Sequence, residues 1–356
     1  MWRTYAASSE TISRYEFGGG QVKVLLAKTT ETTYAEARIC ETLRQKLIEY
    51  GHQADVAISP ACSDPANMME QILAQRCYQI ANACDSLVCF RFPTWFFNHA
   101  NKYFWLTAYQ PFSAQPSSDE PMVSDPYLSE YITRATRAAM AEAEKVYAAT
   151  GESVPECMND AGVELLYAPL AGETAYRCDS FGDTIYCHAH AASLPDIDLV
   201  LQAMQHTKTG VKAFIAGIPN GSQVKEHIWK RIAEAGLSKK VGVQEETFTE
   251  ENHIGNLSRC LAVLPAFLPS GTEFHYAVQE AGCCNKPVIS CASPDCDLLR
   301  HEKSGYWAGR DPKVLARLFD TLFEDKALAE KMGAENGRTV RGLGLSWESI
   351  VGRFTN

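Results

Sequence analysis

Short apolar runs alternate along the chain with longer segments in which apolar residues recur at helical spacing. The first run, residues 22–27 (Val-Lys-Val-Leu-Leu-Ala), is typical of a strand that is buried on both faces of a sheet. In residues 35–50, Ile39, Leu43 and Leu47 share one face of a predicted helix, and Gly51 follows its end. Another strand is expected at 53–58. The order strand, helix, strand predicts two parallel strands with a right-handed crossover.

The same alternation continues and then restarts. In the first half we expect a helix at 68–83, strands at 86–90 and 103–107, a Pro-, Ser- and Asp-rich loop at 111–127, a long helix at 128–149, and a last strand at 165–167. In the second half we expect strands at 184–187, 211–216, 261–268 and 287–291, and helices at 197–206, 224–235, 274–281, 312–323 and 326–340. This pattern predicts an α/β protein with two Rossmann-like domains that face a central cleft.

The domain limits follow from where the pattern stops and restarts. We expect a flexible N-terminal arm at 1–20, a first domain at 21–172, a second domain at 178–340, and a C-terminal segment at 341–356 that packs back on the first domain. Ligands of parallel sheets bind beyond the carboxyl ends of the strands. Candidate site residues are therefore sought at those ends, on both sides of the cleft.

Charge and cysteine usage narrow the class of protein. The formal net charge of −10 argues against a nucleic-acid partner, because a phosphate backbone needs a basic face. The 13 cysteines form no C-x-x-C pair and several lie in apolar runs, which predicts reduced thiols that pack as small hydrophobes. No metal site and no transmembrane segment are indicated, since ligand spacing and a run of roughly 18 apolar residues are both lacking. A cytoplasmic location is expected.

Several short sequence motifs, in the order in which they occur, resemble those of the family-4 (group 1) retaining glycosyltransferases. In the second half these motifs are Leu268-Pro269-Ser270, Phe274, Glu280-Ala281, Lys286-Pro287-Val288-Ile289 and Ser304-Gly305-Tyr306. The tail Ser346-Trp347-Glu348 resembles the closing helix of that family, which crosses back to the first domain. In the first half, Arg91-Phe92-Pro93-Thr94, His99, Asn101-Lys102 and Trp105-Leu106 resemble a bacterial branch of it.

The resemblance implies a GT-B fold and a transferase activity. The first domain would bind the acceptor (a glycan, a lipid-linked or a small molecule), and the second would bind a nucleotide-sugar donor as substrate. Transfer would proceed with retention, without a metal and without a further cofactor. Assembly as a homo- or hetero-oligomer is left open.

The implied donor site gathers on the helix that begins near Phe274. The free N–H groups of its first turn are suited to a diphosphate, and Glu280 lies about two turns along, where its carboxylate is suited to ribose hydroxyls. The alternative for Glu280 is a solvated helix residue. By the resemblance, Glu273 and His275 approach the donor sugar as candidate catalytic residues. The other donor-binding candidates are His190, Gly217, Pro219, Thr272, Phe274 and Tyr276.

The departures from the family fall on charged and glycine positions. The family's first acidic residue of the donor helix is Thr272 here, with Glu273 one place later, where it faces either the donor or solvent. The arginine and lysine that neutralise the diphosphate correspond to His190 and Pro195. A metal pair of His188 and His190 is not favoured, because no third ligand is indicated.

The first domain departs as well. Its Gly-Gly loop corresponds to Thr33-Tyr34, and its His-rich turn to residues 107–110 (Thr-Ala-Tyr-Gln). Together with Arg91, these segments give the acceptor-binding candidates Thr33, Tyr34 and Tyr109. Two functions therefore stay open: a working transferase, or a catalytically inactive glycosyltransferase-like protein that binds a partner or a glycan. An epimerase is disfavoured because its acid–base residues find no match.

Overall fold

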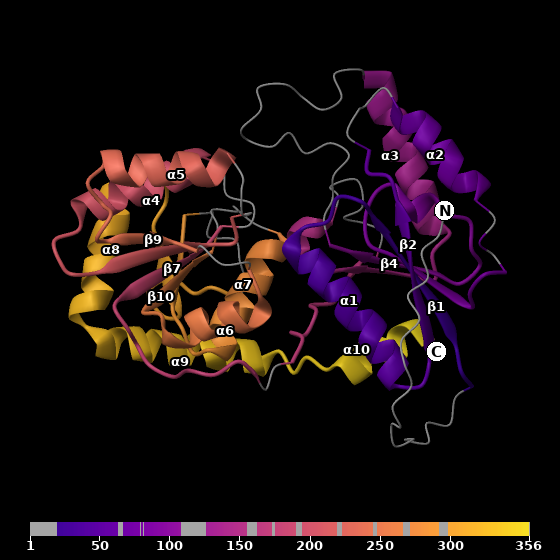
Figure 1. The fold of residues 1–356 in the computed structure, drawn as a ribbon. Coiled ribbons are helices and arrows are strands. Elements are labelled where there is room, and N and C mark those ends of the chain that lie inside the picture. Colours follow the sequence, from indigo (N-terminus) through magenta and orange to yellow (C-terminus); the bar gives the residue numbers. More distant parts are fainter. Residues whose placement is uncertain are drawn as a thin grey trace.

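The protein consists of two α/β units joined side by side (Figure 1). The computed structural model describes residues 20–62, 67–78, 80, 82–107, 126–154, 162–172, 175–189, 194–218, 223–244, 248–265, 271–291 and 298–355. Each unit has one sheet, and every strand pairing in both sheets is parallel. The two Rossmann-like sheets predicted from the sequence are thereby confirmed. In the described part of the chain, no helix is long and apolar enough to cross a membrane.

The first unit is built on the strand order β2-β1-β3-β4-β5-β6. Its strands are β1 (Lys23–Thr29), β2 (Gln53–Ser59), β3 (Ser86–Cys89), β4 (Lys102–Leu106), β5 (Lys145–Ala148) and β6 (Glu164–Leu165). Its helices are α1 (Tyr34–Glu49), α2 (Met68–Cys77) and α3 (Pro126–Ala141), with short 3₁₀ turns at Thr94–Phe96 and Gly151–Ser153. β1 is flanked by β2 and β3, so the chain reverses its direction of travel across the sheet at β1, where open α/β sheets form a crevice.

The second unit is built on the order β12-β11-β10-β7-β8-β9. Its strands are β7 (Thr184–His188), β8 (Lys212–Ala216), β9 (Val241–Val243), β10 (Ala262–Pro265), β11 (Val288–Ser290) and β12 (Gly305–Trp307). Its helices are α4 (Leu194–His206), α5 (Gln223–Glu234), α6 (Glu250–Arg259), α7 (Thr272–Cys283), α8 (Pro312–Glu324) and α9 (Lys326–Gly342). α4 and α5 cover one face of this sheet, and α6, α7 and α9 lie on the other (Figure 1).

The last helix, α10 (Trp347–Thr355), crosses from the second unit to the first, as the sequence predicted. Trp347 donates its indole N–H to the carbonyl of Leu170 over 3.1 Å. Phe354 is fully buried against the rings of Tyr103, Trp105 and Tyr147. The apolar face of α10 is therefore part of the core of the first unit. The chain thus crosses between the units twice, once before β7 and once before α10.

One predicted helix is wrong in its second half. Residues 128–149 were expected to form a single helix, but α3 ends at Ala141 and Lys145–Ala148 is the strand β5. This strand pairs with β4 along its whole length, from Tyr103 with Lys145 to Leu106 with Ala148. Pairing with a central strand outweighs the local helix propensity of an Ala-rich segment. β9 and α6 were not predicted at all.

Two glycines take positions that other residues would not fit, Gly271 because of its positive φ and Gly333 because of a close approach. Gly271 precedes α7 with φ at +91°, a backbone conformation that favours glycine. A Cβ at Gly333 of α9 would lie 1.9 Å from the carbonyl oxygen of Asn285, so α9 packs directly on the chain that leaves α7. The close approach at Gly333 packs α9 against the end of α7, the helix that carries most of the predicted donor residues.

Candidate functional site

The carboxyl ends of the two sheets face each other, and the first turns of α1 and α7 meet there (Figure 1). The side chain of Thr33 caps α1 by accepting a hydrogen bond from the N–H of Glu36. The preceding N–H, that of Ala35, donates to the carboxylate of Glu273 over 2.5 Å. Glu273 itself belongs to the first turn of α7. One carboxylate therefore lies at the positive ends of two helices from different units.

Burial raises the pKa of Glu273 from 4.5 to about 6. Hydrogen bonds from Thr33 and Ala35 oppose this rise, and the negative charges of Glu280 and Glu36 add to it. The loss of hydration is thus the largest effect on this carboxyl. Glu273 is half-buried, and its carboxylate contacts the other unit through the N–H of Ala35.

Thr272, beside Glu273, makes a second contact between the units. Its hydroxyl donates to the carbonyl of Thr107, at the end of β4, over 2.5 Å. The hydroxyl of Ser153 lies 3.4 Å from the hydroxyl oxygen of Thr272. All three residues are buried. Side chains of the two units therefore fill this part of the cleft.

Tyr34, the first residue of α1, makes a third contact. Its ring lies edge-on to four rings of the second unit: those of His188, Phe248, His253 and Tyr276, at centroid distances of 5.3 to 6.4 Å. We call these four residues the ring box. They come from the end of β7, the segment before α6, α6 itself and α7. The side chain of Tyr34 thus reaches into the opposite unit.

Glu280 lies beneath the ring box and is only 1% exposed, so it is not a solvated helix residue. Its Oε1 accepts a hydrogen bond from the hydroxyl of Tyr176 over 3.0 Å. Its Oε2 lies 3.1 Å from Nε2 of His253, within ion-pair distance although not aligned as a hydrogen bond. His253 Nδ1 in turn shares a hydrogen bond of 2.8 Å with the hydroxyl of Tyr186. A buried polar network therefore joins the interdomain segment, α6, α7 and β7.

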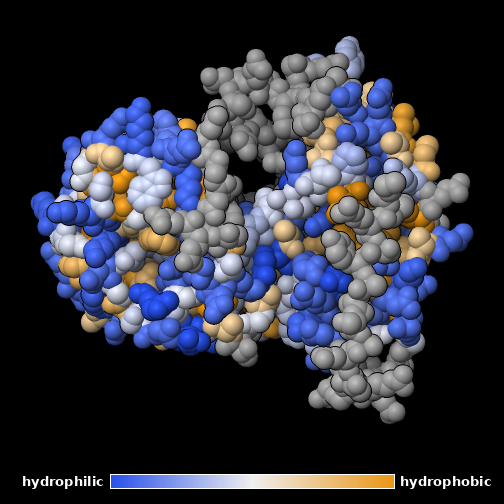
Figure 2. Space-filling view, in the orientation of Figure 1, coloured by the Kyte–Doolittle hydropathy of each residue, from blue (hydrophilic) through white to orange (hydrophobic). Residues whose placement is uncertain are grey.

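A groove of about 1290 Å³ opens beside this closed contact. It is bordered by α1, by α6 and by the interdomain segment around Ala171–Asp179. Arg38 of α1 forms an ion pair with Glu250 of α6 and donates to the hydroxyl of Tyr276. The groove is mainly polar. On the face shown in Figure 2, hydrophilic residues likewise predominate in both units, and apolar residues form small separate groups.

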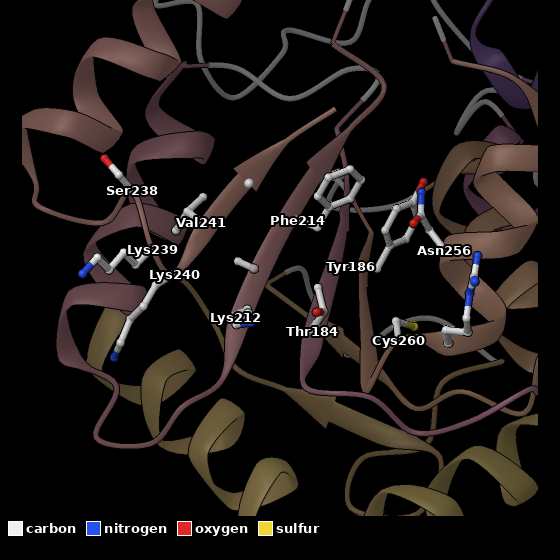
Figure 3. A pocket seen from close by; sticks show the side chains of 13 residues that line it. Thr184, Tyr186, Lys212, Phe214, Ser238, Lys239, Lys240, Val241, Asn256 and Cys260 are labelled. Carbon is white, nitrogen blue, oxygen red and sulfur yellow. The ribbon is translucent and has the colours of Figure 1, made fainter. Parts of the chain in front are cut away.

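A smaller pocket of about 390 Å³ lies beside β7, β8, β9 and the last turn of α6 (Figure 3). Thr184, Lys212 and Val241 stand at the first residues of β7, β8 and β9, so most of the pocket is at the amino ends of these strands. The rings of Tyr186 and Phe214 stack at its centre, with centroids 6.4 Å apart. The pocket shares Phe214, Asn256 and Arg259 with the groove, so the two hollows adjoin each other.

The remaining described candidates lie around the contact without joining it. Phe274 packs on Trp307, and His275 stacks on Tyr167 with centroids 5.8 Å apart. Arg91 is buried within the first unit, where it donates to the carbonyl of Glu31 and lies 3.5 Å from the Glu36 carboxylate. Gly217 follows β8 with φ at +90°.

Three candidates, His190, Pro219 and Tyr109, lie outside the described residues. In the described ranges, no three His, Cys, Asp or Glu side chains come together as a metal site would require. The described cysteines are free thiols, most of them buried.

Among the residues of the site that sequence reasoning missed are Glu36, Arg38, Tyr176, Phe248 and His253. Two of them belong to or precede α6, whose start carried a readable signal. Thr249 is its N-cap and accepts from the N–H of Asn252, and two acidic residues follow Thr249. Tyr176 lies in an irregular segment, so no periodicity could have pointed to it.

Comparison with known proteins finds a family match for the second unit. Residues 185–339 match the family described as glycosyl transferases group 1. This match covers β7 to α9 and includes α7 with Thr272, Glu273 and Glu280. A search with the sequence matched none of the curated proteins.

Solved structures are similar over nearly the whole chain. The Anabaena protein Alr3699/HepE, solved with UDP and glucose, is 12% identical with a TM-score of 0.62, over 94% of this chain and 98% of its own. Sucrose-phosphate synthase from Thermosynechococcus elongatus is 13% identical with a TM-score of 0.67, over 93% and 97%. MurG from Acinetobacter baumannii is 11% identical with a TM-score of 0.58, over 93% and 99%. The expected GT-B fold is thereby confirmed.

Proposed function

We propose that this protein is a group 1 glycosyltransferase that moves a sugar from a nucleotide sugar to an acceptor in the cleft between the two sheets. The observation that carries the proposal is the meeting of the first turns of α1 and α7 around one carboxylate. Each helix end has a partial positive charge and N–H groups that have no partner within the helix. Together they are suited to a diphosphate, even though the sequence offers few cations there.

The proposed transfer of the sugar involves the following bond changes. The bond between the anomeric carbon and the diphosphate oxygen breaks, the acceptor oxygen bonds to that carbon, and the acceptor proton passes to the leaving diphosphate. The helix ends stabilise the charge on the leaving group without a metal, as preorganised dipoles do. In keeping with the family resemblance, we propose that the acceptor attacks on the face the diphosphate leaves, with retention.

The roles proposed for individual residues rest on the geometry for Glu280 and on the family resemblance for the others. Glu280 has lone pairs left for ribose hydroxyls, and Tyr176 and His253 orient its carboxylate. Glu273 and His275 are proposed at the donor sugar. Thr33, Tyr34, Arg91 and Tyr109 are proposed to face the acceptor. We also propose the cytoplasm as the location, because the described cysteines are free thiols.

The experiment that tests the function is a donor panel. The protein is incubated with UDP-glucose first, since one similar structure was solved with UDP and glucose, and then with other nucleotide sugars. Release of the nucleoside diphosphate is measured with simple sugars and glycerol as acceptors. We expect release with at least one donor, unchanged by a metal chelator, and a product that keeps the anomeric configuration. No release with any donor and acceptor contradicts the proposal.

A second function is favoured by a separate observation. Tyr34, Thr272 and Glu273 fill the cleft in this structure, and the groove beside it is polar. Both features suit a protein that binds a glycan or a partner without catalysis. Saturable glycan binding together with no nucleoside diphosphate binding would favour this alternative.

A further inference from the structure

The ring box of His188, Phe248, His253 and Tyr276 has the composition of a site for a planar ring. The rings of His188 and Phe248 are stacked at 5.8 Å with an angle of 16° between their planes. His188 and His253 lie 4.9 Å apart. Stacked and edge-on contacts of this kind favour a flat aromatic guest. The guest in this structure is Tyr34, which comes from the other unit.

The floor of the box is polar and is joined to the proposed ribose site. His253 belongs to the box and lies 3.1 Å from Glu280, which Tyr176 also contacts. A ring with an attached ribose would therefore meet aromatic faces around the ring and a carboxylate at the sugar. A nucleoside combines these two features, whereas a free aromatic amino acid or a glycan lacks one of them.

We propose that the ring box is the nucleobase site of the cleft and that Tyr34 is an intramolecular plug, which a nucleoside diphosphate displaces. This inference rests on the proposed function. Tyr34 and Ala35 are neighbours, and the N–H of Ala35 holds the carboxylate of Glu273. A base that enters the box and a diphosphate that reaches the helix ends thus displace two adjacent contacts in one motion. Donor binding and opening of the units are coupled.

The plug lowers the apparent affinity for nucleotide, because only the unplugged fraction of molecules can bind. Calorimetry with UDP, GDP and ADP compares the parent with Tyr34→Ala and Tyr34→Phe. If fewer than about one molecule in ten is unplugged, Tyr34→Ala binds its preferred nucleotide at least about tenfold more tightly than the parent. Tyr34→Phe keeps the ring and should bind like the parent. Equal affinity of all three proteins overturns the plug.

A second measurement does not depend on nucleotide binding. 4-Methylphenol, the side chain of tyrosine as a free molecule, should raise the melting temperature of Tyr34→Ala and leave that of the parent unchanged. If it stabilises neither protein, the box is not a ring site. If it stabilises Tyr34→Ala while no nucleotide binds to either protein, the box stands and the proposed function fails.

Should Tyr34→Ala not fold, the parent labelled with 3-fluorotyrosine provides the test. The ¹⁹F resonance of Tyr34 is assigned by its loss in Tyr34→Phe. Saturating nucleotide should move this resonance to the position of an exposed tyrosine. If nucleotide binds and the resonance does not move, the plug is overturned. If no nucleotide binds, the result counts against both the plug and the proposed function.

Discussion

The amide N–H of Ala35 in the first unit donates a hydrogen bond of 2.5 Å to the Glu273 carboxylate of the second unit. This bond lies at the first turns of α1 and α7 and is accompanied by the Thr272–Thr107 bond and by Tyr34 in the ring box. The cleft is therefore closed by its own side chains, at the place where the proposed donor would bind.

Glu273 makes stability depend on pH with a definite sign. Its pKa in the folded protein is about 6, raised from 4.5 by burial. Its stabilising contribution is thus fully present below pH 4.5 and is lost as the pH rises through 6. The difference corresponds to at most about 2 kcal/mol. Glu273→Gln cannot ionise, so its free energy of unfolding should exceed that of the parent above pH 6.

Urea unfolding at pH 4.5 to 8 measures this difference. Glu130→Gln, a change of an exposed carboxyl on α3, is the matched control and should follow the parent at every pH. A Glu273→Gln protein that is no more stable than the parent at pH 8 would mean that the carboxylate is well hydrated.

Glu280 should affect stability as well as binding. In Glu280→Ala, the hydroxyl of Tyr176 and the ring of His253 lose a buried partner. The free energy of unfolding should fall by about 1–3 kcal/mol, the usual cost of an unsatisfied buried group. Glu330→Ala, an exposed change on α9, is the control. Chemical unfolding that shows equal stability for the two variants would contradict the buried network.

Lys286 holds the interdomain segment on the second unit. It is fully buried, and its ammonium donates to the carbonyls of Ser180 and Cys260 over 2.5 and 2.9 Å. Lys286→Met leaves both carbonyls unpaired, so the free energy of unfolding should fall by about 1.5–3 kcal/mol. Lys313→Met, on an exposed site of α8, should have little effect. A Lys286→Met protein as stable as the control would show that this ammonium is dispensable.

His190 provides a prediction that comes from the sequence alone. The family resemblance places it where an arginine is expected, and a free imidazole, with a reference pKa of about 6.5, is mostly neutral at pH 7. Nucleoside diphosphate affinity should therefore weaken from pH 6 to 8. Changing His190→Arg together with Pro195→Lys should strengthen binding and remove this pH dependence. Calorimetry at both pH values is the measurement, and tight binding by the parent that does not vary with pH would contradict it.

The fold was largely predictable because buried parallel strands and amphipathic helices leave strong periodic patterns. The pattern failed at residues 145–148, where pairing with β4 decides the structure and the local sequence favours a helix. It also failed at β9 (Val241–Val243), which is too short to show a period.

The site was less predictable, for a different reason. Glu280 was proposed from the resemblance of its helix to the family, and Glu273 because it lies one place after the position expected to be acidic. Their partners come from distant parts of the chain: Ala35 is 238 residues from Glu273, and Tyr176 is 104 residues from Glu280. Only the packing of the two units brings these groups together. No local sequence pattern predicts such contacts between distant segments.

The central claim, that the cleft is a nucleotide-sugar site held closed by its own side chains, is tested most directly by calorimetric titration of UDP, GDP and ADP into the parent and into Tyr34→Ala. We predict saturable binding of at least one nucleoside diphosphate at one site per chain, tighter in Tyr34→Ala than in the parent. Absence of saturable binding for all three nucleotides, in both folded proteins, would contradict the claim.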